Sequence, residues 1–207
     1  MAGTGPLARL AACALLGASA LAGAACSPGS GGSAASTTSA AAPNGVVTVT
    51  ITGGFATDPA DAGRPVVLIA AALGVPTAVF RQAFRLVTPA AAGEEPDPEQ
   101  VRRNKAALLS VLGPYGVTNA DLDRVSNRYR FDGRAGERWP TTAAKAVAVV
   151  EGGKVTAIKV TEAGAGYTQA PRVTVTGATG VTATATVAFG KDLATNGSIS
   201  SIRVTAG

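Results

Sequence analysis

Hydrophobic and polar residues alternate over residues 46–54, VVTVTITGG. Val47, Val49 and Ile51 alternate with threonines, and a period of two places one type of side chain on each face of a strand. The pattern therefore predicts a half-buried strand, and we take residues 46–63 as an N-terminal strand and loop.

The period changes after residue 63. In GRPVVLIAAALG, Pro65 suits a first helical turn and Gly74 suits a helix end. The next stretch predicts a second helix whose apolar residues share one face; these are Val79, Phe80, Ala83, Phe84 and Val87.

Two further helices are predicted before residue 132. The third has Asp97 as its N-cap and Pro98 at its first position. Gln100 lies at the third position, where a capping box has the residue that pairs with the N-cap. Its expected apolar side consists of Val101, Ala107, Leu108, Leu109 and Leu112. The fourth is capped by Thr118 or Asn119, with Leu122, Val125 and Tyr129 facing inward. Residues 64–140 therefore form the expected helical segment.

Strand patterns return in residues 141–207. KAVAVVEGGKVTAIKVT predicts two strands joined by a tight hairpin at Gly152 and Gly153. GKVTAIKVT, from Gly153, aligns with GSISSIRVT, from Gly197, so that Ile158 matches Ile202. We therefore predict an α+β fold, in which a small segment of about four helices is followed by an antiparallel β-repeat module.

A motif within this module adds a resemblance. Gly164, Gly166, Tyr167 and Thr168 precede Pro171 and the strand VTVTG at 173–177. This arrangement resembles the glycine-tyrosine β-repeats of phage structural proteins and bacterial surface proteins. The resemblance implies an architecture and not a catalytic activity. The remainder of the chain resembles only uncharacterised exported bacterial proteins, which imply no activity.

The N-terminal region predicts export. Arg9 precedes an uncharged run from Leu10 to Ala25, and a short apolar run after a basic residue is typical of a signal peptide, here residues 1–25. The small residues before Cys26 resemble the lipobox of bacterial lipoproteins over residues 1–26. The resemblance implies that Cys26 carries a diacyl anchor and becomes the mature N-terminus. The alternative is an ordinary signal peptide and a secreted protein without lipid.

Residues 26–45 fit the same interpretation. They consist mainly of Ser, Gly, Ala and Thr, which cannot bury enough apolar surface to fold, so we expect a flexible tether after the lipidated cysteine. Cys13 leaves with the leader, and Cys26 is then the single mature thiol, so an intramolecular disulfide is excluded. We expect a membrane-anchored protein on the extracytoplasmic side.

Composition excludes several kinds of active site. The chain has no histidine, which excludes Ser-His-Asp triads, Cys-His pairs and histidine-rich metal sites. Carboxylate pairs remain, at Asp58 with Asp61 and at Asp121 with Asp123. We interpret both as helix N-terminal charge. Asp58 and Asp61 are also weak candidates for a calcium site, and no cofactor is expected.

Residues 124–140 interleave arginines with aromatic residues, a pattern that suits anionic or carbohydrate ligands. The candidate ligand-binding residues are Arg128, Tyr129, Arg130, Arg134, Arg138 and Trp139. In the alternative interpretation, Tyr129 and Trp139 pack the helices onto the sheet and the arginines are solvated or paired. The formal net charge of +5 is modest, and an exported protein is not expected to bind nucleic acid.

Together these patterns predict a lipid-anchored envelope protein that acts as a non-enzymatic binding or structural module. Its expected partners are the membrane, through the lipid, and cell-wall glycan, an acidic polymer or another envelope protein. The alternative from another class is a carboxylate-dependent hydrolase of cell-wall or surface polysaccharide.

Overall fold

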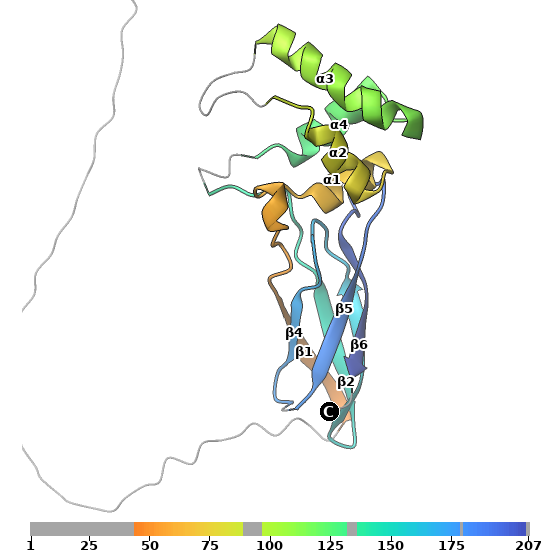
Figure 1. The fold of residues 1–207 in the computed structure, drawn as a ribbon. Helices are drawn as coiled ribbons and strands as arrows, with labels where there is room; N and C mark the ends of the chain where they lie inside the picture. Colours follow the sequence, from red (N-terminus) through yellow and green to blue (C-terminus); the bar gives the residue numbers. More distant parts are fainter. Residues whose placement is uncertain (1–43, 89–96, 132–135, 179, 206–207) are drawn as a thin grey trace, which may run out of the picture. The chain divides into compact units, whose positions relative to one another are not determined.

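The sheet is formed by one strand that precedes the helices in the sequence and five strands that follow them. The computed structural model describes residues 44–88, 97–131, 136–178 and 180–205. In these residues, four α-helices and a six-stranded antiparallel sheet form the predicted mixed α+β fold (Figure 1). The helices are α1 (Val66–Leu73), α2 (Thr77–Phe84), α3 (Pro98–Leu112) and α4 (Asn119–Tyr129). The strands are β1 (Asn44–Thr52), β2 (Lys145–Glu151), β3 (Lys154–Glu162), β4 (Arg172–Val175), β5 (Thr182–Ala188) and β6 (Ser198–Thr205).

The first strand of the sequence lies in the middle of the sheet. The strand order is β3-β2-β1-β4-β5-β6, and every pair of neighbours is antiparallel. Residues 44–48 of β1 pair with β2, and residues 49–52 pair with β4. The N-terminal strand and the strands of residues 141–207 therefore share one sheet, with the helical segment inserted between them in the sequence.

The predicted hairpin joins β2 to β3. Gly152 and Gly153 both have positive φ, 57° and 76°, which suits a two-residue hairpin turn. The Gly152 N–H donates to the Asn44 side-chain oxygen at 2.9 Å. This bond ties the start of β1 to the hairpin end of the sheet.

The two edges of the sheet meet near the helices. The Ile199 N–H donates to the Ala163 oxygen at 2.8 Å, and the Tyr167 N–H donates to the Gly197 oxygen at 3.0 Å. These bonds join the chain after β3 to the start of β6. The apolar faces of the strands enclose one core, which includes Val49, Ala148, Ile158, Val173 and Ile199.

Helix boundaries follow the predicted caps closely. Asp97 caps α3 by accepting from the Gln100 N–H at 2.9 Å, and Thr118 forms a capping box with Asp121 at the start of α4. Gly74 ends α1 with a left-handed φ of 72°. Pro65 was expected in the first turn of this helix, but α1 begins one residue later, at Val66, and Pro65 is its N-cap.

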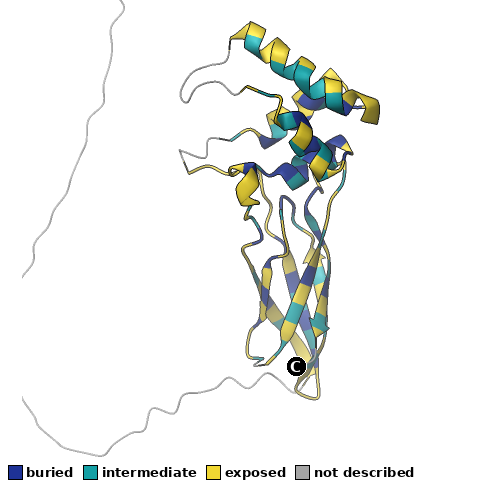
Figure 2. Cartoon of the chain, in the orientation of Figure 1, coloured by how far each residue is buried: buried dark blue, intermediate teal, exposed yellow. Residues whose placement is uncertain are grey.

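The apolar side of α3 differs from the expectation at one position. Val101 was expected to face inward, but it is 36% exposed. The reason is that α3 reaches the helical core through its C-terminal half, where Leu108 and Leu109 pack and Leu112 is fully buried. Figure 2 shows the exposed outer side of this helix.

The helices lie at one end of the strands (Figure 1). No single described helix is long and apolar enough to cross a membrane, although α1 and α2, bent by 104°, meet the length and composition criteria as a pair. Their buried residues belong to the helical core. Phe55 packs against both this core and the sheet core, so the end of β1 is where the two cores join.

Candidate functional site

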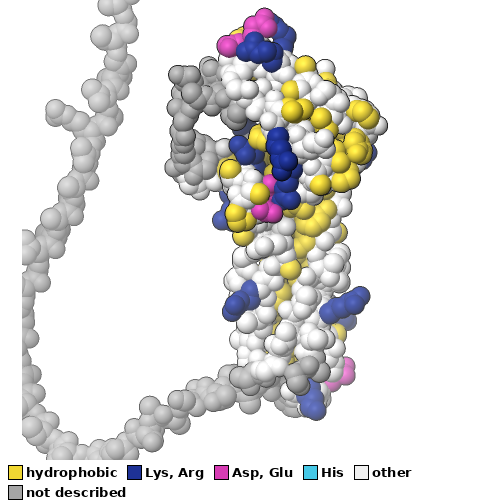
Figure 3. All heavy atoms as spheres, viewed as in Figure 1, with side chains coloured by type: hydrophobic (Ala, Val, Ile, Leu, Met, Phe, Trp, Pro, Cys, Tyr) yellow, Lys and Arg dark blue, Asp and Glu magenta, His cyan; other side chains and the backbone are white. Residues whose placement is uncertain are grey.

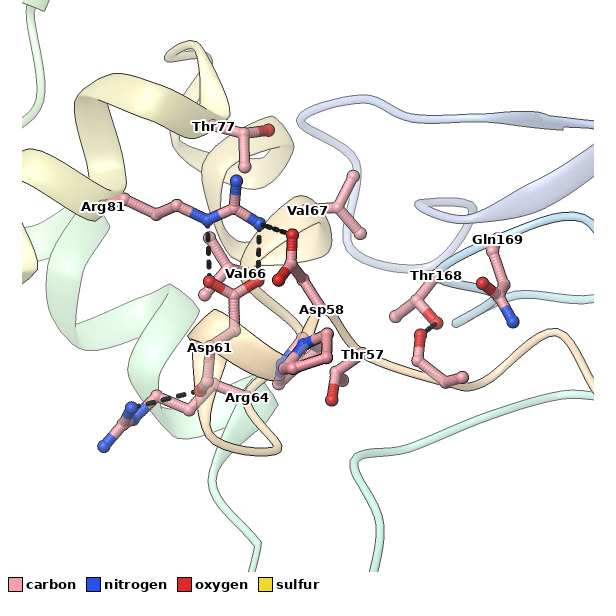
Figure 4. Close-up of a pocket in the computed structure, with 13 residues that line it drawn as sticks. Thr57, Asp58, Asp61, Arg64, Val66, Val67, Thr77, Arg81, Thr168 and Gln169 are labelled. Atoms are coloured by element: carbon pink, nitrogen blue, oxygen red, sulfur yellow. Dashed lines mark hydrogen bonds and ion pairs between the residues drawn. The ribbon is translucent and has the colours of Figure 1, made fainter.

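A buried aspartate and an arginine form the centre of the site. Both oxygens of Asp61 accept from Arg81, at 2.7 Å from Nε and 2.8 Å from Nη2. The same Nη2 also donates to Asp58 Oδ2 at 3.0 Å. Arg81 on α2 therefore holds together two carboxylates that precede it by about twenty residues (Figure 4).

The loop after β1 places these carboxylates. Asp58 caps a single 3-10 turn, η1 (Pro59–Asp61), and its side chain accepts from the Ala60 N–H at 2.9 Å. The turn directs Asp61 inward, where the residue is 5% exposed. A buried carboxylate needs a partner, since removing the charge from water is costly, and Arg81 supplies a bidentate one.

The ion pair fixes the charge of the arginine. The hydrogen bond to Asp61 raises the pKa of the Arg81 guanidinium above its ordinary value, with further stabilisation from the charge of both aspartates. Arg81 is therefore positively charged at neutral pH and well above it. Its third nitrogen, Nη1, points away from both carboxylates (Figure 4).

A pocket of about 510 Å³ opens beside this ion pair. One wall is the loop after β1 and the start of α1, with Pro59, Val66 and Val67 as apolar surface. Arg81 and Thr77 of α2 form the second wall (Figure 4). The rest of the lining consists of Ala56, Thr57, Asp58, Asp61, Arg64, Pro65, Thr168 and Gln169.

The glycine-tyrosine motif supports the third wall of the pocket. The hydroxyl of Thr168 donates to the Ala56 oxygen at 2.7 Å, which holds the turn after β3 against the loop after β1. Tyr167 is buried, stacks on Phe55 with ring centroids 4.7 Å apart, and accepts from the Ala144 N–H at 3.0 Å. The motif therefore positions Thr168 and Gln169 at the pocket.

Arg64 contributes a second guanidinium at the edge of the pocket. Its Nη1 donates to the Asp61 backbone oxygen at 3.2 Å, and its guanidinium carbon lies 4.5 Å from the Phe84 ring centroid. Because it stacks on an aromatic ring, this guanidinium is held beside the helices. Figure 4 shows its end pointing away from Arg81.

Two of the predicted ligand-binding residues are in the interior. Tyr129 is 6% exposed and Trp139 is 4% exposed. Trp139 Nε1 donates to the Gly166 oxygen at 2.9 Å, and its ring meets Phe131 edge to face. Both positions agree with the alternative interpretation, in which these rings pack the helices onto the sheet, and neither ring offers a free face to a ligand.

The described arginines of the same stretch have different surroundings. Arg138 lies over the Phe55 ring, 4.8 Å from its centroid, and Arg130 is exposed. Arg128 is half-buried, and its Nε has no hydrogen-bond partner among the described residues. Arg134 lies outside the described residues, as does the lipidation candidate Cys26. Ligand binding by these arginines stays a prediction.

The second aspartate pair is separate from the pocket. Asp121 belongs to the capping box of α4, and the hydrogen bond from the Thr118 hydroxyl lowers the pKa of its carboxyl. Asp123 pairs with Lys105 of α3 at 2.6 Å. The role of Asp121 matches the interpretation as helix N-terminal charge, whereas the ion pair between Asp123 and Lys105 was not predicted.

The carboxylates do not form a metal site of the usual kind. Among the described residues, no group of three or more His, Cys, Asp or Glu side chains converges on one point. All four carboxylate oxygens of Asp58 and Asp61 already accept hydrogen bonds from protein groups. Calcium takes 6–8 oxygen ligands, so this donor set does not fit it.

Several pocket residues were not among the sequence candidates, namely Thr77, Arg81, Thr168 and Gln169. Arg81 lies on the polar side of a predicted amphipathic helix, where an arginine has no distinguishing signal. Thr168 and Gln169 adjoin the glycine-tyrosine motif, which was the one available indication.

The chain was compared with protein families, characterised proteins and solved structures, and it matches none of them.

Proposed function

We propose that the protein is an exported, lipid-anchored envelope protein whose folded domain is a non-enzymatic binding module. The leader, the cysteine at position 26 and the polar tether support the anchor. The strand β1 begins at Asn44, so residues 44 and 45, the last two of the expected tether, belong to the strand. The proposal therefore accounts for the order of leader, tether and domain in one chain.

The main structural support for the proposal is that the two ends of β1 lie at opposite ends of the sheet. Asn44 pairs with Glu151, beside the hairpin turn, whereas Thr52 leads into the loop that forms the pocket. The chain thus enters the domain at the end of the sheet opposite the helices (Figure 1). Asn44, where the described domain begins, and the pocket therefore lie at opposite ends of β1.

The arrangement of the carboxylates favours binding over hydrolysis. A carboxylate-dependent hydrolase needs one carboxyl group as acid and another free as base or nucleophile. Asp58 and Asp61 are instead bound to the same guanidinium, and Asp61 is bidentate. This geometry supports a structural ion pair beside a ligand pocket, so the hydrolase is the weaker candidate.

The β-repeat interpretation is part of the proposal. Ile158 pairs with Ala148 in β2–β3, and Ile202 pairs with Ala185 in β5–β6. All four residues are buried. The matched isoleucines of the sequence repeat thus have equivalent neighbours, which supports two related hairpins on either side of β1 and β4.

Lipidation is tested by substitution of each cysteine in turn. In the native host, we expect the mature protein to begin at residue 26 and to carry the added mass of a diacylglyceryl group. Cys26→Ala should abolish this mass and move the protein out of the membrane fraction, because a diacyl chain provides stable attachment. Cys13→Ala is the matched control and should change neither result.

Two outcomes contradict the anchor. The first is a Cys26→Ala protein that stays lipidated or membrane-bound. The second is a wild-type mature chain without added lipid, which identifies the secreted alternative.

A further inference from the structure

We propose that the pocket beside Arg81 binds an uncharged saccharide unit. The inference rests on the proposed function and specifies its ligand class. The pocket lies between the loop after β1, helix α2 and the turn after β3 (Figure 4). Its volume of about 510 Å³ lies within the ~300–1,000 Å³ range of small-ligand sites.

The charge of the pocket is balanced. The formal charges of Asp58, Asp61, Arg64 and Arg81 cancel, and three of these four groups form one ion-pair cluster. A phosphate or carboxylate ligand at Arg81 would approach an arginine whose charge is already neutralised by two aspartates, and the Arg64 guanidinium stacks on Phe84 and points away from Arg81. An amine would find carboxylates already bound to the arginine. The lining therefore favours an uncharged ligand.

The polar groups of the pocket suit hydroxyl groups. Arg81 Nη1 supplies donors that point away from the carboxylates, and Thr77 supplies a hydroxyl, which both donates and accepts (Figure 4). Gln169 adds an exposed amide with both functions. Within the described part of the chain, these groups make no hydrogen bond to protein. A sugar ring, which carries donors and acceptors on neighbouring carbons, matches such a set.

The rest of the lining provides apolar surface and polar groups that the protein already holds in place. Pro59 and Val67 provide carbon surface for the C–H face of a sugar ring, whereas Val66 is buried beneath them in the helical core. The bidentate bond between Asp61 and Arg81 fixes the guanidinium before a ligand arrives. The hydroxyl of Thr168 fixes the third wall through Ala56. Such preorganisation lowers the entropic cost of binding.

The charged groups on the face drawn in Figure 3 agree with a neutral ligand. On the face drawn in Figure 3, acidic and basic side chains lie next to each other over the helical part, and neither sign forms a broad field. A polymer of one charge would be recognised through such a field. Binding of an uncharged glycan depends instead on the shape and hydrogen bonds of the pocket.

The test uses the full chain, extracted in detergent, with neutral and anionic probes. The neutral probes are cellotetraose, maltotetraose, mannotetraose and the tetramer of N-acetylglucosamine; the anionic probes are tetragalacturonate and linear polyphosphate. Calorimetric titration should detect at least one neutral probe with a Kd of about 1 mM or tighter. Because no net charge is paired, its affinity should change less than about twofold between low and high salt.

Substitutions locate the site. The double variant Thr77→Ala, Gln169→Ala should weaken binding of the neutral probe by about tenfold or more, since it removes two hydrogen-bonding groups. Gln82→Ala is the matched control, because Gln82 is exposed on the same helix α2 and does not line the pocket. All variants should unfold at the wild-type temperature.

Three results overturn the inference: no binding of any neutral probe, binding of the anionic probes alone, or equal affinity of the double variant and wild type. None of them affects the lipidation of Cys26, so failure of the saccharide site remains distinguishable from failure of the anchor.

Discussion

The side-chain nitrogen of Asn196 lies 2.8 Å from the hydroxyl of Tyr129. The same nitrogen donates to the Leu68 backbone oxygen at 2.8 Å, and the Asn196 side-chain oxygen accepts from the Gly190 N–H at 3.1 Å. One buried amide from the loop before β6 thus binds α1, α4 and its own loop. This residue joins the helices to the sheet.

We expect Asn196→Ala to lower the free energy of unfolding by roughly 2–4 kcal/mol, because buried partners lose their hydrogen bonds and a small cavity remains. Chemical denaturation measures the change. Asn127→Ala, on the exposed side of α4, should change stability by less than about 0.5 kcal/mol. Similar losses in the two variants would contradict the role given to Asn196.

Tyr129 predicts a loss of stability in alkaline solution. Burial raises the pKa of its hydroxyl above the ordinary value of 10.0, although the hydrogen bond from Asn196 lowers it in part. A raised folded-state pKa gives stability that is present below pH 10 and is lost as the pH rises through the folded value. Tyr129→Phe should therefore show a weaker decline in unfolding free energy above pH 10.

The control for this titration is Tyr115→Phe, because Tyr115 is an exposed residue in the 3-10 turn Gly113–Tyr115 that follows α3. Its alkaline decline should match that of the wild type. At neutral pH, Tyr129→Phe should also cost about 1 kcal/mol, since Asn196 loses an acceptor. An alkaline profile of Tyr129→Phe identical to that of wild type would exclude this residue as the cause.

We expect alanine substitutions at the two adjacent glycines after β1, Gly53 and Gly54, to lower stability by different amounts. Both have positive φ, 71° at Gly53 and 84° at Gly54, so each substitution carries a backbone cost of about 1–2 kcal/mol. At Gly54 the new Cβ would also lie 2.7 Å from Tyr167 Cδ1, whereas at Gly53 nothing lies within 4 Å. Gly54→Ala should be clearly more destabilising, and near-ultraviolet circular dichroism should report the displaced Tyr167 ring.

We expect the two aspartates bound to Arg81 to contribute unequally to the free energy of unfolding. Asp61→Ala removes a buried, bidentate partner and should cost about 1–3 kcal/mol, given that Arg81 remains partly hydrated. Asp58→Ala removes one exposed contact and a cap of η1, and should cost less than about 1 kcal/mol. Thermal unfolding measures both, and a larger loss for Asp58→Ala would contradict the assigned burial.

Local patterns were sufficient to predict most of the elements. Caps at Asp97 and Thr118, the stop at Gly74 and the two glycines of the hairpin all act within a few residues, and each is where the sequence indicated. The inward face of α4 follows helical spacing and was also confirmed. These features depend on neighbours in the chain, which the sequence displays directly.

Long-range pairings could not be predicted in the same way. The place of β1 in the sheet depends on β4, more than a hundred residues later, and its alternating pattern fits an edge as well as a centre. Asn196 and Arg81 likewise have partners that are distant in sequence. For Trp139, the surrounding arginines suggested a surface site, whereas its indole binds the Gly166 oxygen in the interior.

The central position of β1 has a consequence for the order of folding. During synthesis, β1 is the first described strand to be made. Its two neighbours in the sheet, β2 and β4, are made only after the whole helical segment. Contacts of such high sequence separation form slowly, because a long loop must close before they are gained. The pairing of β1 on both sides therefore cannot be completed until residues near 175 are available, and the whole sheet needs the chain as far as β6, which ends at Thr205.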